Sequence, residues 1–322
     1  MAGPVEQPSK NHHYVTQAYL RRFANGEGKV WDTWLTKDGI LREKPRATKS
    51  AGSADFLYST RPQARWEKPT LDDAVERKFF QPLDDEAARA ITKLIEGPSD
   101  LDEEQAVQWA RFVNSLLERT PEVLERRLGQ LQEVAQETVS GMLERAQSDE
   151  SRRRFEESLS AIHMDGLLGN MNLNLMAQEI DDPAVLRHLA GLCPYIMTLD
   201  VGFLLPTSDN PVLVNMGKPG PIQFYSMSLS PRTFLIALPG PKQELDRDFA
   251  LQALLAHCCF LPSQSKHMYS QEPLRDGVPV KFRRAAAVGL TPVPWRNTKK
   301  RSPRTNLAPS PRATPQNDKG VG

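Results

Sequence analysis

Apolar residues recur at helical spacing between about residues 70 and 192, which predicts a series of amphipathic helices. In the first part of this region the spacing is interrupted at Pro82, and the apolar positions are Leu71, Val75, Phe79, Leu83, Ala87, Ile91 and Leu94. Thr120 and Pro121 fit the cap and first residue of a later helix. The apolar stripe of that helix comprises Leu124, Leu128, Leu131, Ala135 and Val139. We therefore expect a central helical bundle.

The regions on either side of this bundle have different patterns. Tyr19, Leu20 and Phe23 lie within one turn of each other and predict a short buried helix. Polar and apolar residues then alternate around Asp38-Gly39, a dipeptide that suits a tight turn, so a β-hairpin is expected there. Residues 193–240 contain β-branched and aromatic runs that end in Pro, Gly, Ser or Asn. The predicted fold is α+β: an N-terminal helix and β-hairpin, a central helical bundle and a C-terminal antiparallel sheet.

Composition places this chain among ordinary globular proteins. Of its 322 residues, 39% are hydrophobic and 25% are charged, which is enough apolar material for a packed core. No apolar stretch approaches the roughly 18 residues of a membrane span, and the N-terminus lacks the apolar segment of a signal peptide. The three cysteines form no CxxC pair and predict neither a disulfide framework nor a zinc site. We expect a cytoplasmic protein with no membrane partner.

Charge is distributed unevenly along the chain. Residues 292–322 hold seven Lys or Arg and one Asp, or +6, so the overall +1 leaves −5 for the remainder (1 minus 6). This basic segment is also rich in Pro and Ser, which predicts a disordered tail. Residues 1–291 are expected to form a single integrated domain. Its acidic balance is unlike the basic surface of a dedicated nucleic-acid binder.

Four blocks in this sequence resemble one known family. They are HHYVTQAYLRRF, FVNSLLERTPEVLERR, FLLPTSDNPVLV and MSLSPRTFLIAL, in that order along the chain. Together they resemble the domain-of-unknown-function family 4238, in which Pro is usual at the position of Thr16 and an aromatic residue is common at that of Ala18. The resemblance implies a shared fold. It implies no reaction, because the family has no established activity.

His12 and His13 are the first candidates for chemistry. Either imidazole could bind a metal ion or move a proton near neutral pH. His13 is favoured as a catalytic residue because it is nearer the short helix at Tyr19. The competing interpretation is that a histidine here caps the helix or fills a cleft.

The Ser208-Asp209-Asn210-Pro211 segment is the second candidate. Asp209 could be a catalytic residue or a metal ligand, and Asn210 could help to bind a cofactor, because both lie on a loop between two strand-like runs. The same four residue types are also common turn formers. A purely structural turn therefore remains an alternative.

Arg119 and Glu76 complete the set. Arg119 precedes Thr120 and Pro121, and its guanidinium could neutralise a phosphate or a carboxylate. Alternatively, it could satisfy the carbonyl groups at a helix end or pair with Glu122. Glu76 could point toward the histidines as a metal ligand or base, although a glutamate on an amphipathic helix usually faces solvent.

These candidates support two functional hypotheses. The first is a metal-dependent hydrolase, acting on nucleic acid or another phosphodiester, in which His12, His13, Glu76 and Asp209 hold a divalent ion and Arg119 binds an anion. The alternative is a noncatalytic protein that binds a ligand or regulates a partner. Phosphate-loop, GxGxxG, HExxH and GxSxG motifs are absent, which argues against the enzyme classes that use them. The sequence leaves the substrate, the metal and the oligomeric state open.

Overall fold

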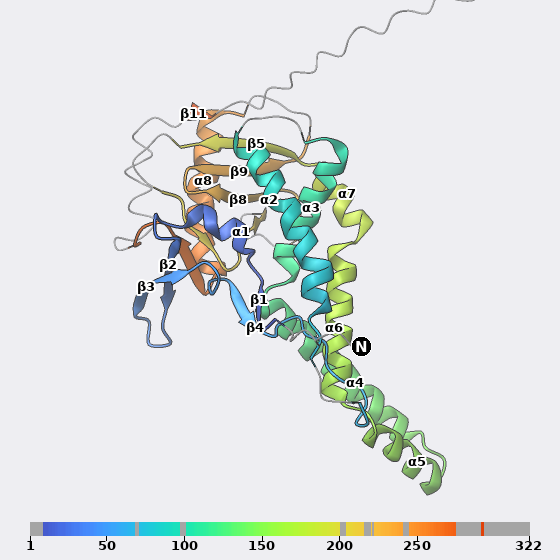
Figure 1. Cartoon of the computed structure of the whole chain (residues 1–322). Coiled ribbons are helices and arrows are strands. Elements are labelled where there is room, and N and C mark those ends of the chain that lie inside the picture. Colours follow the sequence, from blue (N-terminus) through green and yellow to red (C-terminus); the bar gives the residue numbers. More distant parts are fainter. Residues whose placement is uncertain are drawn as a thin grey trace, which may run out of the picture.

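A computed structural model describes residues 9–67, 71–96, 101–199, 204–215, 220, 222–240, 245–274 and 291–292 (Figure 1). The chain is α+β, with the helices in the middle of the sequence and antiparallel strands on both sides of them. The predicted fold class is therefore confirmed. Most of the predicted tail lies outside the described residues.

The N-terminal part contains the predicted short helix and hairpin. Its elements are β1 (Asn11–His13), α1 (Gln17–Leu20), the 3-10 turn η1 (Arg21–Phe23), β2 (Lys29–Leu35), β3 (Leu41–Ala47) and β4 (Ser53–Asp55). Strands β2 and β3 pair in antiparallel register, and Gly39 in their turn has a φ of 80°, which an L side chain rarely adopts. Tyr19, Leu20 and Phe23 are fully buried, as the pattern predicts.

The helical part begins with a wide turn. Its elements are the π-helical turn η2 (Glu76–Phe80), α2 (Gln81–Glu96), α3 (Glu103–Glu118), α4 (Pro121–Glu144), α5 (Asp149–Ser160), α6 (Met164–Ile180) and α7 (Pro183–Ala190). The break expected at Pro82 is wrong, because η2 runs directly into α2. Pro82 is the second residue of α2 and directly follows the π-helical turn, inside a helical run that begins at Ala74. Thr120 caps α4 and Pro121 is its first residue, as predicted.

The C-terminal part forms most of the sheet structure. Its elements are β5 (Cys193–Thr198), β6 (Thr207–Ser208), β7 (Leu213–Val214), β8 (Tyr225–Ser230), β9 (Thr233–Leu238), α8 (Arg247–Phe260), η4 (Leu261–Gln264), β10 (His267–Ser270) and β11 (Thr291–Pro292). One sheet has the order β11-β5-β9-β8-β7, and a second has the order β3-β2-β10-β6. Strand β10 thus joins the N-terminal hairpin to the Ser208 segment. Strands β1 and β4 form a separate pair.

The five-stranded sheet is covered on both faces. Along β9, Leu235 and Ala237 belong to the larger apolar core, which includes residues of α2 and α3. Phe234 and Ile236 alternate with them and pack in a smaller core with α8. This two-residue alternation is the ordinary consequence of strand geometry. Both faces of the sheet are therefore apolar.

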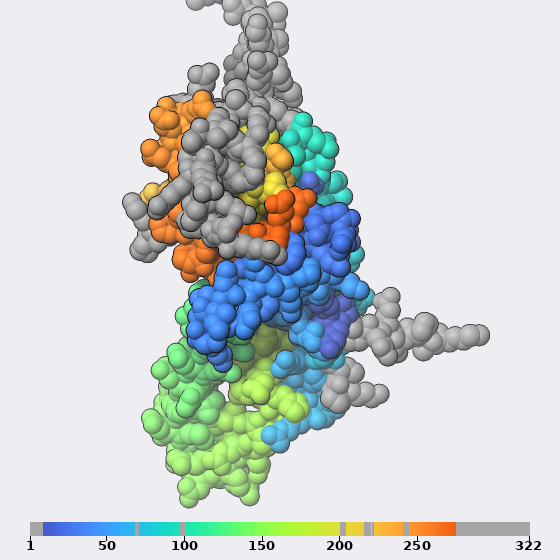
Figure 2. All heavy atoms as spheres, turned by 90° about the vertical axis from the view of Figure 1, so that its left-hand side faces the viewer, coloured from blue at the N-terminus to red at the C-terminus, as the bar shows by residue number. Residues whose placement is uncertain are grey.

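Helices α4 and α5 extend away from the sheets (Figures 1 and 2). Leu124 is the buried residue of α4, and α5 has no buried residue. The apolar stripe predicted along α4 is therefore only partly correct, because its remaining residues are half-buried: Leu128, Leu131, Ala135 and Val139. Helical periodicity reports an apolar face but does not show where the helix leaves the core. None of the described helices combines the length and apolarity that a membrane span requires.

Candidate functional site

His12 is a structural residue in β1. Its ring is fully buried and stacks on Tyr58, with 5.8 Å between the ring centroids. Nε2 lies 2.9 Å from the carbonyl oxygen of Ser9, and Nδ1 accepts a hydrogen bond from the backbone N–H of Tyr58 at 2.9 Å. This arrangement requires the tautomer that carries its proton on Nε2. Burial lowers the pKa of His12, so the ring is neutral at pH 7 and both its nitrogens are used.

His13, the next residue, has a different environment. Its Nε2 atom is buried and has no hydrogen-bond partner. Burial is the main cause that lowers the pKa of His13, and the positive charge of Arg119 lowers it further. Hydrogen bonding to the backbone of Lys49 and Thr48 opposes these effects. His13 is thus neutral at pH 7 and lies within electrostatic range of Arg119.

Glu76 is the first residue of the wide turn η2. Its Oε1 atom accepts a long hydrogen bond, 3.5 Å, from the backbone N–H of His13. Its Oε2 atom is buried without a partner. Burial raises the pKa of Glu76 to about 7; Asp84 adds to this rise, and Arg119 opposes it. The expectation that a glutamate here faces solvent is wrong, because the turn directs Glu76 toward His13.

Arg119 lies at the end of α3 and its side chain is fully buried. Nη1 forms an ion pair of 2.9 Å with Oδ1 of Asp84, and the guanidinium lies 5.1 Å from the ring centroid of Phe80. The Nε and Nη2 atoms have no hydrogen-bond partner. The guanidinium thus pairs with Asp84 and does not satisfy carbonyl groups at the helix end. The backbone carbonyl of Arg119 accepts a hydrogen bond of 2.8 Å from the hydroxyl of Tyr58.

We call His13, Glu76, Asp84 and Arg119 the His13–Arg119 cluster. The structure brings together three residues that the sequence nominates, and it adds Asp84, which sequence reasoning missed. A signal for Asp84 was available, because Glu76, Phe80 and Asp84 are spaced four residues apart and share one helix face. Burial raises the pKa of Asp84, and the positive charge of Arg119 opposes this rise. Arg119 therefore favours the ionised form of its carboxylate partner.

Asp209 and Asn210 follow β6 and are held by a different part of the chain. Oδ2 of Asp209 accepts hydrogen bonds from the backbone N–H groups of Lys266 and His267, at 3.2 and 3.1 Å. The Asn210 carbonyl accepts a hydrogen bond of 2.9 Å from Nε2 of Gln264. Burial raises the pKa of Asp209 to about 6, while its contacts with His267 lower it. These bonds fit the structural alternative, in which the loop is fixed as a turn.

A second set of charged side chains, of which Asp32 and Asp209 are buried, surrounds this loop. His267 Nδ1 lies 2.8 Å from Oδ1 of Asp32, and Arg46 Nε lies 2.9 Å from Oδ2 of the same carboxylate. We call Asp32, Arg46, Asp209 and His267 the Asp209–His267 cluster. The hydrogen bond to Asp32 is the main cause that raises the pKa of His267. Sequence reasoning gave no warning of this cluster, because its members come from four separate strands or loops.

Tyr14, which follows His13, interacts electrostatically with Asp209 of the Ser208–Pro211 loop. Burial raises the pKa of Tyr14 to about 12, and the negative charge of Asp209 contributes to the rise. Tyr58, in turn, interacts electrostatically with both Tyr14 and Arg119. His13 and Asp209, the predicted catalytic residues, therefore belong to different clusters.

These side chains do not form a metal centre. Across the described part of the chain, no group of three or more His, Cys, Asp or Glu residues is placed to hold a metal ion. His12, Glu76 and Asp209, which the sequence nominates as ligands with His13, have separate partners. The arrangement at His13 offers something else: a buried guanidinium with free donors beside a neutral imidazole and a carboxyl group that titrates near pH 7.

The chain belongs to a protein family defined by sequence. The family model described as "Protein of unknown function (DUF4238)" matches residues 11–252, which include every residue of both clusters except His267. The resemblance seen in the four sequence blocks is thus confirmed. No curated protein and no solved structure matches this chain.

Proposed function

We propose that the His13–Arg119 cluster binds a small oxyanion, a phosphate ester or a carboxylate. The observation that carries this proposal is the Arg119 guanidinium, which is fully buried yet has no partner at Nε or Nη2. Buried donors of this kind are rare in folded proteins because each loses its hydrogen bonds to water. An oxyanion would satisfy both of these groups with the paired geometry that a guanidinium prefers.

The neighbouring groups determine when the anion binds. Asp84 already balances one charge of Arg119, and an ionised Glu76 would add a second negative charge next to the ligand. Because the pKa of Glu76 is about 7, this charge is absent below pH 7 and present above it. Anion affinity is therefore expected to fall as the pH rises through about 7.

Sulfate is a suitable probe because it does not titrate in this range. Calorimetric titration of the full chain with sodium sulfate should show binding at pH 6 and about tenfold weaker binding at pH 8, a factor equal to roughly 1.4 kcal/mol. Glu76→Gln should bind sulfate equally at both pH values. Glu133→Gln on the exposed side of α4 is the matched control and should retain the pH dependence. Absence of sulfate binding at pH 6 would overturn the proposal.

Hydrolysis of a phosphodiester is a second candidate function for the same cluster. It is favoured by a specific pairing: His13 has a free Nε2 atom, and Glu76 has a pKa of about 7. His13 could accept a proton from an attacking water, and protonated Glu76 could donate one to the leaving oxygen. Arg119 would stabilise the negative charge that develops on the phosphoryl oxygens.

The model substrate bis(4-nitrophenyl) phosphate tests this second function. Wild-type protein should release 4-nitrophenol, and His13→Gln and Glu76→Gln should each lower the rate by about 100-fold or more. Asp209→Asn should leave the rate nearly unchanged, because Asp209 lies in the other cluster. If wild type releases no product while sulfate still binds, the protein binds anions without this hydrolysis.

A further inference from the structure

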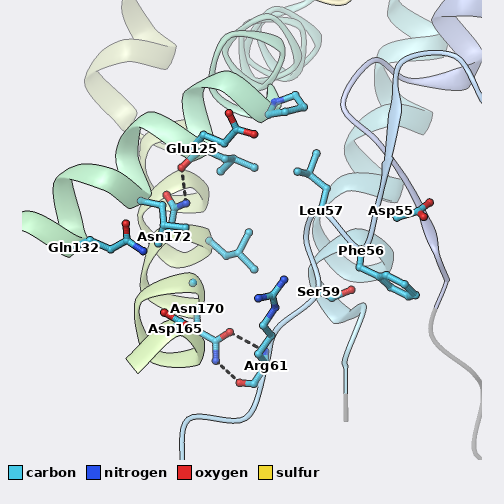
Figure 3. Close-up of a pocket in the computed structure, with 15 residues that line it drawn as sticks. Asp55, Phe56, Leu57, Ser59, Arg61, Glu125, Gln132, Asp165, Asn170 and Asn172 are labelled. Carbon is cyan, nitrogen blue, oxygen red and sulfur yellow. Dashed lines mark hydrogen bonds between the residues drawn. The ribbon is translucent and has the colours of Figure 1, made fainter. Parts of the chain in front are cut away.

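A cavity of about 490 Å³ lies between α4, α6 and residues 55–61 (Figure 3). We propose that it binds a small amphipathic molecule with an apolar body, an N–H donor directed at Asn172 and an acidic group within reach of Arg61. Its volume is within the range of roughly 300–1,000 Å³ that is usual for small-molecule sites. The inference rests on the lining of this cavity and not on the oxyanion proposed for the His13–Arg119 cluster.

The apolar body would contact a wall of aliphatic side chains. Three elements contribute to this wall, which consists of Leu57, Pro121, Leu124, Leu128 and Leu173. Leu124 and Leu173 are buried, whereas Leu57 and Leu128 are half-buried. The partly exposed leucines would lose contact with water when a ligand covers them, and this favours binding.

Two buried polar side chains lie among these apolar residues. Asn172 is 5% exposed and Ser59 is 6% exposed, and both line the cavity. The Nδ2 group of Asn172 donates a hydrogen bond of 2.9 Å to the Leu124 carbonyl, which fixes the orientation of the amide. Its Oδ1 atom and the Ser59 hydroxyl have no hydrogen-bond partner. An N–H donor on the ligand would complete the bonding of Asn172, as buried polar groups require.

Arg61 supplies the positive charge of the cavity. Asn170 holds its backbone with two hydrogen bonds, one accepted from the Arg61 N–H at 2.9 Å and one donated to the Arg61 carbonyl at 2.8 Å. The side chain extends from this fixed point toward the space beside α6 (Figure 3). Three carboxylates, those of Asp55, Glu125 and Asp165, also line the cavity, so an acidic group is expected to bind next to Arg61 and away from them.

Gly169 leaves part of the α6 face open. It lines the cavity, and a Cβ atom added at this position would meet no other atom within 4 Å. A larger side chain at Gly169 can therefore occupy the space of a ligand without first displacing the protein. This makes Gly169→Leu a direct test of the site.

Two fluorescent probes separate the parts of the proposal. 1-Anilinonaphthalene-8-sulfonate has an aromatic body, one N–H group and a sulfonate, while N-phenyl-1-naphthylamine lacks only the sulfonate. Both should bind the full chain saturably. Arg61→Gln should weaken binding of the sulfonate about tenfold and leave the uncharged probe unchanged. Gly169→Leu should abolish binding of both probes.

Matched variants make the result specific. Gly129→Leu on α4 is the control for Gly169→Leu, since its added Cβ also meets no atom within 4 Å and Gly129 does not line the cavity. It should bind both probes as wild type does. Arg126→Gln, on an exposed part of α4, is the control for Arg61→Gln. Glu76→Gln should bind both probes normally, which separates this site from the His13–Arg119 cluster.

Circular dichroism would first establish that each variant is folded, because the sulfonate probe also binds loosened proteins. If Gly169→Leu does not fold, Leu128→Trp fills the same cavity from the opposite helix. Absence of saturable binding to wild type would overturn the proposal. Binding that persists in folded Gly169→Leu, or a sulfonate affinity that Arg61→Gln leaves unchanged, would also overturn it.

Discussion

The two polar clusters differ in the kind of atom that is left without a partner. In the Asp209–His267 cluster the unpartnered atom is a carboxylate oxygen, Oδ1 of Asp209, and this carboxylate is held through its other oxygen. Both oxygens of Asp32 are paired, one with His267 and one with Arg46. In the His13–Arg119 cluster the unpartnered atoms include the N–H groups of a fully buried guanidinium. Unpaired acceptors are tolerated more often than unpaired donors. This difference supports a structural role for the Asp209–His267 cluster and the oxyanion binding that we propose for the His13–Arg119 cluster.

The largest expected effect comes from removing the charge partner of Arg119. Asp84→Ala should lower the free energy of unfolding by about 3–5 kcal/mol, because it leaves a buried guanidinium without a counter-charge. Urea denaturation followed by circular dichroism measures this change.

Arg111 and Asp181 provide the matched control for that substitution, because they form an ion pair that is partly exposed. Asp181→Ala should cost only about 0–1 kcal/mol. If the two variants are equally stable, Arg119 does not depend on Asp84, and the distinction between the clusters fails.

Removal of the Asp209 carboxylate should have a smaller effect. Asp209→Ala leaves the backbone N–H groups of Lys266 and His267 without their acceptor, so we expect a loss of about 1–3 kcal/mol. Sulfate binding should remain at the wild-type level, as measured by the same calorimetric titration. Loss of sulfate binding in a folded Asp209→Ala protein would show that the two clusters form one site.

The smallest effect is a pH dependence at Glu76. Its pKa is raised from 4.5 in the unfolded chain to about 7 in the fold, so the folded state favours the protonated form. This contribution to stability is fully present below pH 4.5 and is lost as the pH rises through about 7. After allowance for partial exposure, Glu76→Gln should exceed wild type in stability by about 1–2 kcal/mol at pH 8.

Denaturation at pH 4 and at pH 8 tests this prediction. The two proteins should converge at pH 4, where Glu76 is protonated in both the folded and the unfolded state. Equal stability of wild type and Glu76→Gln at pH 8 would mean that burial does not penalise the ionised carboxylate.

Local patterns were sufficient to predict much of the fold. The hairpin at Asp38-Gly39 and the helix start at Thr120-Pro121 depend on the conformations of neighbouring residues, which short sequences specify well. The apolar stripe of α4 was correct as a helix and wrong as a buried surface beyond Leu124. Burial depends on what packs against a helix, and the sequence of that helix does not contain this information.

The candidate residues were predicted better than their grouping. His13, Glu76 and Arg119 were nominated separately, and the structure places them within electrostatic range of each other. The predicted convergence of the histidines with Asp209 did not include Tyr14, which interacts electrostatically with that carboxylate. Adjacent residues on a strand point to opposite faces, so the different environments of His12 and His13 follow from strand geometry once β1 is known. The spacing alone did not predict whether His12 or His13 would point toward Arg119.

The direction in which Glu76 points depends on the number of residues in the wide turn η2. A π-helical turn contains one more residue than an α-helical turn, and each residue of an α-helix adds about 100° of rotation. Phe80 and Asp84 are anchored on Arg119, so loss of one residue inside η2, such as the exposed Lys78, would rotate Glu76 away from His13 while the rest of α2 stayed in register. Within this family, insertions and deletions at η2 are thus expected to change the chemistry of the cluster more than substitutions on its exposed face.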